Sequence, residues 1–385
     1  MRNLIRWLGL CFVIVGLLAC APEAPAPVVT IVQTALPEPT ATLARPTTVA
    51  LQPTTAAATT VPPRTPTVAP TVAPLPSEPP PTATATRVAP LPTATIASTA
   101  TSGAATPTTL PRGFVFGKFG AGNGDLNEPT GIAVTADAIY VTERGNHRIQ
   151  RFNLQGGFVW KAGVQGGGDG QLNEPGGIVV LGNNVFVADL NNQRVAVFNA
   201  TNGAWVRSIG VGGDDVNQLR APTAVAVDAI GKLFVSDRAN KRVQVYERTF
   251  EPLRMVGSGG GKPEQFGALG AGGVAVDSRD SIYVSDTSND RILMFDFRGD
   301  FIKAFGGAGN TGGKLLKPQG VALDNLGRVL VADVGNKRIA LFNADGSFVE
   351  NKVIQGLEQP TSVASDSRGA VHVTDTKTHR VIVVR

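Results

Sequence analysis

The sequence predicts an all-β protein, a six-bladed β-propeller with four-stranded antiparallel blades that follows a disordered Pro/Thr-rich linker. Three observations lead to this prediction. One polar motif recurs six times after residue 112, its copies follow one another at intervals in the forties, and short β-branched runs bounded by turn signals lie between them. A fixed period of this length with strand-like content is typical of a repeat architecture.

Residues 1–20 have the pattern of an export signal. Arg2 and Arg6 precede an apolar run over residues 8–18, which is too short to span a membrane comfortably. The end of the run, LLAC at residues 17–20, resembles the lipobox of bacterial lipoproteins, which implies cleavage before Cys20 and lipidation of that residue. An ordinary secretory leader and an uncleaved anchor remain alternatives. The other cysteine, Cys11, lies inside the apolar run, so no disulfide can stabilise the exported part.

Residues 21–111 consist almost entirely of Pro, Thr, Ala and Val. All but seven of the 27 prolines lie within the first 111 residues. Proline fixes φ and lacks a backbone donor, so helices and sheet ladders are disfavoured and an extended conformation is favoured. We therefore expect a disordered stalk that holds the following domain, residues 112–385, away from a membrane surface.

Within that domain, the first repeat predicts four strands over residues 131–134, 139–143, 148–153 and 158–163. The first of these strands is apolar on both faces, so both faces must be covered, as they are when blades pack around an axis. The equivalent innermost strands of the other repeats lie at residues 177–180, 224–227, 273–276, 320–323 and 362–365.

The two ends of the domain complement each other. Residues 114–120 (FVFGKFG) match the fourth strand of a repeat, whereas the last repeat stops after its third strand at residues 380–385. We therefore expect the N-terminal strand to pair with the C-terminal one and to close the sixth blade.

The recurring motif reads acid-x-x-Asn-x-Arg, as in TERGNHRIQRF from Thr142. Its spacing lets an antiparallel hairpin bring the acid against the guanidinium group, with Asn146 expected where the turn needs a positive φ. Because the motif recurs in every repeat, we predict that it is structural rather than catalytic. The sequence leaves open whether the pairs are buried or exposed. The pairs are Glu143 with Arg148, Asp189 with Arg194, Asp237 with Arg242, Asp286 with Arg291, Asp333 with Arg338, and Asp375 with Arg380.

Pro-x-Gly-Val/Ile-Ala-Val, then Val-x-Asp, then Asn-x-Arg-Ile/Val, repeated near this spacing, resembles the NHL repeat family. The resemblance covers residues 113–385 and implies a six-bladed propeller. Members of the family include sensor domains of receptor kinases, an amidating lyase, and recognition modules that bind RNA or protein. Two repeats depart from the pattern, because the fourth lacks the proline (ALGAGGVAV) and the sixth has Thr378 in place of the asparagine. We expect the turns of these two repeats to be less regular.

The glycine-rich loops and the motif turns are expected to emerge on one face of the ring, which we call the loop face. Loops at such a place can vary without disturbing the blades. His147 and His379 share one turn position in the first and sixth repeats, where a variable, solvent-facing residue is expected; His372 lies within a strand and is expected to be packed. The candidate binding residues of the loop face are Arg144, His147, Arg238, Lys241, Lys337 and His379.

Other chemistry has less support in the sequence. The zinc-binding histidines of the amidating lyase relatives have no counterpart on the innermost strands, and a catalytic zinc site needs about three protein ligands. Four acids that recur between the first and second strands, Asp228, Asp277, Asp324 and Asp366, are predicted to form turns rather than bind a metal. None of the glycine-rich loops precedes a helix, so the basis of a phosphate loop is missing. No cofactor, metal or catalytic residue is therefore predicted.

Charge gives little support for nucleic-acid binding. The first 111 residues hold five of the 35 basic and three of the 30 acidic side chains, so 30 and 27 remain in the domain. We therefore expect an exported, lipid-anchored and monomeric recognition module that displays its propeller at the outer face of the cell membrane or cell envelope. It would bind an extracytoplasmic protein, peptide or glycan through the loop face, and not nucleic acid. One alternative is an extracytoplasmic metal-dependent lyase or lactonase that acts in the central channel, and another is a structural spacer module with no small ligand.

Overall fold

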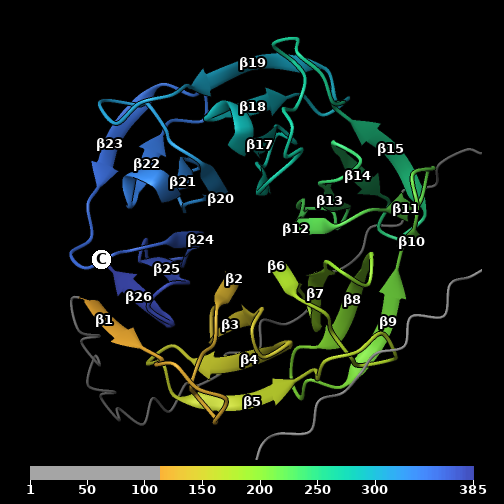
Figure 1. Ribbon diagram of the computed structural model, residues 1–385, viewed down its shortest axis with the longest axis vertical. Helices are drawn as coiled ribbons and strands as arrows, with labels where there is room; N and C mark the ends of the chain where they lie inside the picture. Colours follow the sequence, from red (N-terminus) through yellow and green to blue (C-terminus); the bar gives the residue numbers. More distant parts are fainter. Residues whose placement is uncertain (1–112) are drawn as a thin grey trace, which may run out of the picture. The chain divides into compact units, whose positions relative to one another are not determined.

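A computed structural model describes residues 113–385 of the chain. The predicted signal peptide with Cys20 and the predicted stalk lie outside these residues. The described part is a ring of six four-stranded antiparallel sheets, which confirms the predicted six-bladed propeller (Figure 1). No helix within residues 113–385 is long and apolar enough to cross a membrane.

In blades one to five the strands run outward from the central axis in chain order, and in blade six the N-terminal strand takes the outermost place. Blade one contains β2 (Pro129–Val134), β3 (Ala138–Glu143), β4 (Arg148–Asn153) and β5 (Phe158–Ala162). Blade two contains β6 (Pro175–Leu181), β7 (Asn184–Asp189), β8 (Arg194–Asn199) and β9 (Trp205–Ile209). Blade three contains β12 (Pro222–Val227), β13 (Leu233–Asp237), β14 (Arg242–Tyr246) and β15 (Pro252–Val256).

Blades four to six continue the ring. Blade four contains β16 (Val274–Val276), β17 (Ile282–Asp286), β18 (Arg291–Phe295) and β19 (Phe301–Gly306). Blade five contains β20 (Pro318–Leu323), β21 (Val329–Asp333), β22 (Arg338–Phe342) and β23 (Phe348–Lys352). Blade six contains β24 (Pro360–Ser365), β25 (Val371–Asp375), β26 (Arg380–Val384) and β1 (Gly113–Phe116).

Only short elements lie outside the blades. A two-stranded parallel ladder, β10 (Val211–Gly212) with β11 (Gln218–Leu219), lies in the connection from blade two to blade three. Single 3₁₀ turns, η1 (Thr287–Asn289) and η2 (Val334–Asn336), follow the motif acids of blades four and five. The innermost strand of blade four, β16, has only three residues, which agrees with the missing proline in that repeat.

The N-terminal strand closes the ring as predicted. β1 pairs with β26 in antiparallel register, with Gly113 opposite Val384 and Phe116 opposite Val381. In Figure 1 the orange β1 lies beside the dark blue β26, although they come from opposite ends of the domain.

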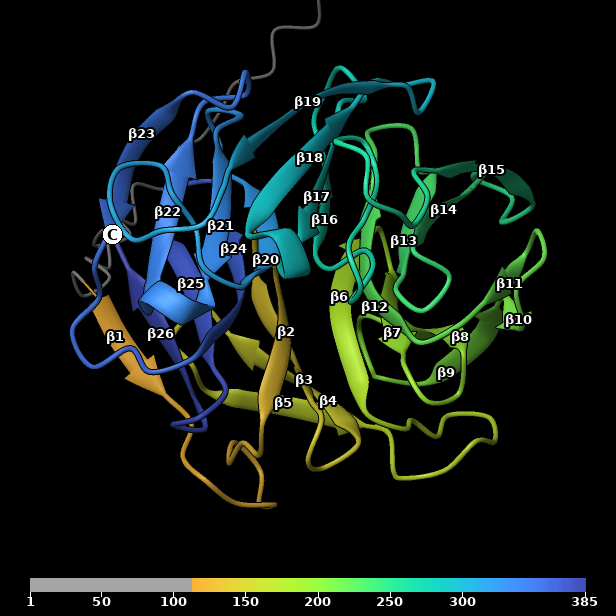
Figure 2. The ribbon, with the colours of Figure 1, turned by 45° about the horizontal axis from the view of Figure 1, so that its top comes forward.

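The hydrophobic core lies between the blades. Each of six clusters of buried side chains joins two neighbouring blades, for example blades three and four through Phe234, Val245, Ile282 and Phe295. This arrangement explains why the inner strands are apolar on both faces, since each sheet is covered on both sides (Figure 2). The fourth strands form the outer wall, where side chains alternate between partly buried and exposed in β5 and β15.

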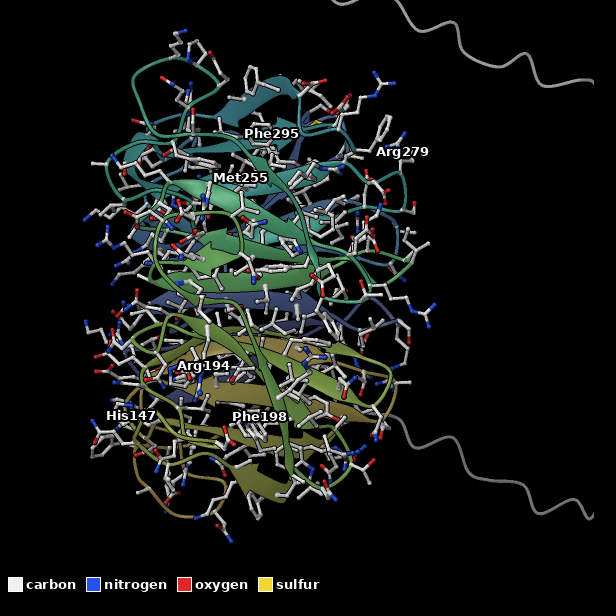
Figure 3. All side chains as sticks on the ribbon, turned by 90° about the vertical axis from the view of Figure 1, so that its right-hand side faces the viewer. His147, Arg194, Phe198, Met255, Arg279 and Phe295 are labelled. Atoms are coloured by element: carbon white, nitrogen blue, oxygen red, sulfur yellow. The ribbon has the colours of Figure 1, made fainter. Side chains whose placement is uncertain are left out.

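The ring has two distinct faces. Figure 3 shows His147, in a motif turn, at one rim and Arg279, in a turn between first and second strands, at the opposite rim. The glycine-rich loops lie on the His147 side, because they hydrogen-bond to the motif turns, as Arg148 Nη1 does to the Ala121 carbonyl at 2.7 Å. The loop face therefore combines both sets of loops.

Candidate functional site

The motif acids and arginines form ion pairs under the loop face. Each acid ends a second strand, each arginine begins a third strand, and the two residues stand opposite each other in register, as Asp237 and Arg242 do. All six acids have no exposed surface. In blade three, Arg242 Nε lies 2.9 Å from Asp237 Oδ2. The structure therefore answers the question that the sequence left open, because every acid is fully buried and the arginines are buried or half-buried.

Each pair also holds the adjoining glycine-rich loop. Arg242 donates to the carbonyls of Asp214, Asp215 and Gln218, while Asp237 Oδ1 accepts a hydrogen bond from the backbone N–H of Arg220 at 2.7 Å. Burial raises the pKa of Asp237, and the hydrogen bonds from Arg220, Asn240 and Arg242 oppose that rise. The motif thus ties each loop to its blade.

The motif asparagine does not occupy the position that we expected. The residue with positive φ is the next one, His147 at 51°, and the other five blades have Gln193, Lys241, Asp290, Lys337 and His379 in this conformation. Asn146 instead donates through Nδ2 to Glu143 Oε2 and to the Gly120 carbonyl. Its amide is selected by these two acceptors rather than by backbone conformation.

Blade six shows what the loss of this asparagine does. Thr378 stands in its place, and its hydroxyl is buried without a hydrogen bond. Arg380 lies 3.6 Å from Asp375, its Nε has no partner, and its Nη2 donates to the Gly356 carbonyl. The sixth pair is therefore looser than the other five, as the departure in sequence suggested.

The turn position of His147 and His379 varies between blades as expected, but these two side chains do not simply face solvent. Both are half-buried, and Nδ1 of each accepts a backbone N–H from the following blade at 3.1 Å. His147 accepts from Glu174 and His379 from Glu128, and Asp290 Oδ1 accepts from Lys317 in the same way. These side chains connect neighbouring blades. The exposed ring of Phe119 also packs on His379, with centroids 4.8 Å apart.

The central channel opens on the loop face through a cavity of about 240 Å³, which we call the channel mouth. Two of the candidate binding residues, Arg144 and Arg238, line it, whereas Lys241, Lys337, His147 and His379 do not. Lys337 is paired with Glu358 at 2.8 Å. Hydroxyl groups fasten the blades around the mouth, since Thr130 donates to the Pro175 carbonyl and Thr287 to the Pro318 carbonyl.

Beyond the mouth the channel is aliphatic. A second cavity of about 260 Å³ shares Gly177, Ala224 and Gly320 with the mouth and continues past Val180 and Val227. The glycines here allow close packing of blades, because a Cβ on Gly177 would lie 2.8 Å from the Ala224 Cα.

The acids of the turns at the opposite face accept hydrogen bonds from their own turns. Asp228 Oδ1 accepts the N–H groups of Ile230 and Lys232, and the other three acids repeat this pattern. In the described part of the chain, no group of three or more His, Cys, Asp or Glu residues is arranged to hold a metal ion.

His372 lies inside blade six, as expected for a packed residue. It is 2% exposed, and its Nε2 is 3.7 Å from Asp366 Oδ2. Burial lowers the pKa of His372, which favours the neutral imidazole, while Asp366 opposes that shift. This side chain is remote from solvent and does not line either cavity.

Three residues of the channel mouth were not predicted from the sequence. Glu174, Leu190 and Leu269 line the cavity with Arg144 and Arg238. Leu269 lies in a segment between Phe266 and Val274 that is two residues longer than the equivalent segment of the other blades, which extends from Leu126 to Ile132 in blade one. A blade-by-blade alignment of the repeats contains this signal.

Comparisons with known proteins support the architecture. Residues 126–152, 172–198 and 315–342, in blades one, two and five, match the NHL repeat model. No curated protein matches the chain in sequence.

Solved structures with a similar fold have little sequence in common with this chain. A protein of unknown function from Bacteroides thetaiotaomicron has a TM-score of 0.52 at 16% identity, covering 70% of this chain and 76% of that chain. Streptogramin B lyase has a TM-score of 0.52 at 9% identity, covering 70% and 97% respectively. A catalytically inactive virginiamycin B lyase from Staphylococcus aureus with quinupristin has a TM-score of 0.50 at 12% identity, covering 71% and 96%. At such identities these similarities show the fold alone.

Proposed function

We propose that this protein is a membrane-anchored, extracytoplasmic recognition module that binds a protein, peptide or glycan through the loop face of its propeller. The observation that carries the proposal is the open channel mouth on that face. It combines charged side chains, Arg144, Arg238 and Glu174, with apolar ones, Leu190 and Leu269, in one concave site. Binding sites commonly have this composition, with apolar walls and a few placed polar groups.

The NHL repeats support the same conclusion. An NHL propeller is suited to protein binding, because the buried motif pairs hold the loops while the exposed residues of the loops vary between blades. The residue that follows the motif acid is Arg144 in blade one, Leu190 in blade two and Arg238 in blade three, although the acid itself hardly changes. A rigid frame with variable loop residues favours recognition.

Anchoring and location rest on the sequence. The apolar run that ends at Cys20 favours export and lipidation, and the Pro/Thr-rich segment that follows favours a spacer between anchor and propeller. In this proposal, the lipid attaches the chain to the outer face of the cell membrane or cell envelope and the loop face meets its partner outside the cell.

The test is an affinity capture from envelope extract with the full chain. A loop-face variant changes Arg144, Arg238, Lys241 and Lys337 to Ser. A matched variant changes Arg248, Arg279, Arg298 and Lys303 to Ser, which removes the same charge from the opposite face and the outer wall. Both variants are first compared with the wild type in thermal unfolding.

We expect the wild type and the matched variant to retain a partner that the folded loop-face variant loses. Retention by all three proteins would contradict binding through the loop face. If none of them retains a partner, the recognition module is rejected, and metal analysis with a lactone and peptide substrate screen would test the lyase or lactonase alternative.

A further inference from the structure

Two positions of the repeat meet beside the channel mouth in blade one. One immediately precedes the first strand and the other immediately follows the motif acid. In blade one they are Glu128 and Arg144, and Arg144 Nε lies 3.0 Å from Glu128 Oε2. Blade one therefore neutralises its own charges at the rim.

Blades two and three each hold one half of this pair. In blade two the acid is present as Glu174, but the arginine is replaced by Leu190. In blade three the arginine is present as Arg238, but the acid is replaced by Ala221. Ala221 has a φ of 52°, close to the 50° of Glu128, so the backbone of the rim is the same. The side chains differ while the frame is kept.

The two unmatched charges face one cavity. Among residues 113–385, the carboxylate of Glu174 and the guanidinium group of Arg238 make no hydrogen bond or ion pair, and both side chains line the channel mouth. They are not paired with each other within 4.0 Å. An acid and a base that are separated in one pocket provide complementary partners for a ligand that carries both charges.

Two leucines line the same cavity as these charges. Leu190 lies on the blade-two side, and Leu269, which is 54% exposed, lies on the blade-four side. The longer segment of blade four packs directly on Arg238, because a Cβ on Gly270 would lie 1.9 Å from the Arg238 carbonyl oxygen. Gly270 has a φ of 70°, which suits glycine, so the sequence of this segment fits its position. The aliphatic channel continues below.

We propose that the channel mouth binds a small zwitterion with an aliphatic side chain, either a free amino acid or a short peptide. Its ammonium group faces Glu174, its carboxylate faces Arg238, and its side chain packs against Leu190 and Leu269. Both groups of such a ligand are charged at neutral pH. The inference rests on the proposed function, since it names the ligand class for the same face.

The first experiment measures binding to the full chain by calorimetry. The probes are leucine, Leu-Leu, N-acetyl-Leu-Leu and Leu-Leu amide. We expect a zwitterionic probe to bind. Either cap should weaken binding about tenfold or more, because it removes one charged group of the ligand together with its charge-assisted hydrogen bond. Comparison of leucine with Leu-Leu distinguishes a free amino acid from a peptide.

Two variants assign the ends of the ligand. In Glu174→Gln, N-acetylation of the probe should cause no further loss, because the group that recognises the ammonium is already gone. In Arg238→Gln, amidation of the probe should cause no further loss of affinity, because the group that recognises the carboxylate is already gone. A structural effect of either substitution would lower the affinity for all probes equally and would contradict the assignment.

A third variant keeps Glu174 and Arg238 but gives each of them a partner of opposite charge within the protein. Leu190→Arg with Ala221→Glu rebuilds in blades two and three the pair that blade one already contains. We expect unchanged thermal unfolding and a loss of at least tenfold in zwitterion affinity. The matched control, Ala229→Glu with Ile230→Arg, adds the same charges at an exposed turn of the opposite face and should bind like the wild type.

Three outcomes would overturn the inference: equal binding of capped and uncapped probes, undiminished binding by the rebuilt variant, or no binding of either zwitterion by the wild type. If the loop face still captures its partner from envelope extract in any of these cases, the recognition function stands and only the zwitterion site is rejected.

Discussion

Buried charges within the blades are tolerated because every carboxylate oxygen of a regular repeat has donors. Asp333 Oδ1 accepts the backbone N–H of Leu316 at 2.7 Å, and Oδ2 accepts Asn336 Nδ2 and Arg338 Nε, both at 2.8 Å. A buried ion pair adds little net stability over an apolar pair of the same volume, but the loss of one partner leaves an uncompensated charge. The motif therefore makes each loop depend on an intact pair.

We predict that Arg242→Ala lowers the free energy of unfolding by about 3–5 kcal/mol, because Asp237 would be left charged in a site with no exposed surface. Arg380→Ala should cost clearly less, because that arginine is already 3.6 Å from Asp375 and 28% of its side chain is exposed. Urea denaturation of the two variants tests this order. Equal losses would show that the blades do not depend on the asparagine-supported geometry.

The strands differ in how their places in the blades are stabilised. Three strands of every blade are joined by short turns, so local sequence sets their register. β1 has no such link, since its pairing with β26 joins residues more than 260 positions apart, for example Phe114 with Val383. Phe114 and Phe116 of β1 pack against the cluster that joins blades six and one, where the Phe116 and Phe152 rings lie 4.8 Å apart.

Removal of residues 113–116 should therefore destabilise the whole ring by more than about 3 kcal/mol, because β26 would become an exposed edge and two phenylalanine rings would be lost from the core. Urea denaturation and hydrogen exchange of the full chain without these four residues test the prediction. Increased exchange should begin in blades six and one. Unchanged exchange there would show that β1 does not hold the ring closed.

The complete ring is held by contacts between blades, and tyrosine hydroxyl groups contribute to these contacts. The chain has three tyrosines, all buried. The hydroxyl of Tyr140 donates to the Ala200 carbonyl and that of Tyr283 to the Ala344 carbonyl, in each case in the following blade. The Tyr246 hydroxyl is buried between blades two and three without a hydrogen bond.

Burial raises the pKa of Tyr283 to about 12 and also raises the pKa of Tyr140 and Tyr246 above 10.0. As the pH rises above 10, the unfolded chain loses these protons first, so it binds fewer protons than the folded protein and stability falls. We predict that absorbance at alkaline pH shows no phenolate in the folded protein near pH 10 and full ionisation on unfolding. Ionisation of any tyrosine near pH 10 without unfolding would contradict the burial.

Tyr246→Phe isolates one of these contributions. Because the hydroxyl has no partner, the substitution should change the free energy of unfolding at pH 7 by no more than about 1 kcal/mol. The free energy of unfolding of this variant should also fall less between pH 9 and 11 than that of the wild type. Tyr283→Phe is the matched comparison, because it also loses the bonds to Asp277 and Ala344.

The sequence alone determined the number of blades, the strands and the closure of the ring by the N-terminal strand, which the structure places at Gly113–Phe116. These features follow from the period of the repeat, from the turn signals between the strands and from the complementary ends of the domain. Each of these is visible in short stretches of sequence or in their regular repetition. The acid and arginine of each motif are also close in the chain, so their pairing could be inferred from a single hairpin such as that from Asp237 to Arg242.

Only the tertiary structure decided what depends on contacts between blades. One such feature is the burial of the motif acids. Another is the hydrogen bond from the Glu174 N–H to His147, which lie 27 positions apart, and a third is the position of Glu174 and Arg238, from different blades, at one cavity. The positive φ next to Asn146 was missed because two hydrogen-bond acceptors, Glu143 Oε2 and the Gly120 carbonyl, select the asparagine, whereas its own backbone conformation does not. A linear sequence pattern cannot predict these contacts, because they form only when the six blades pack into a ring.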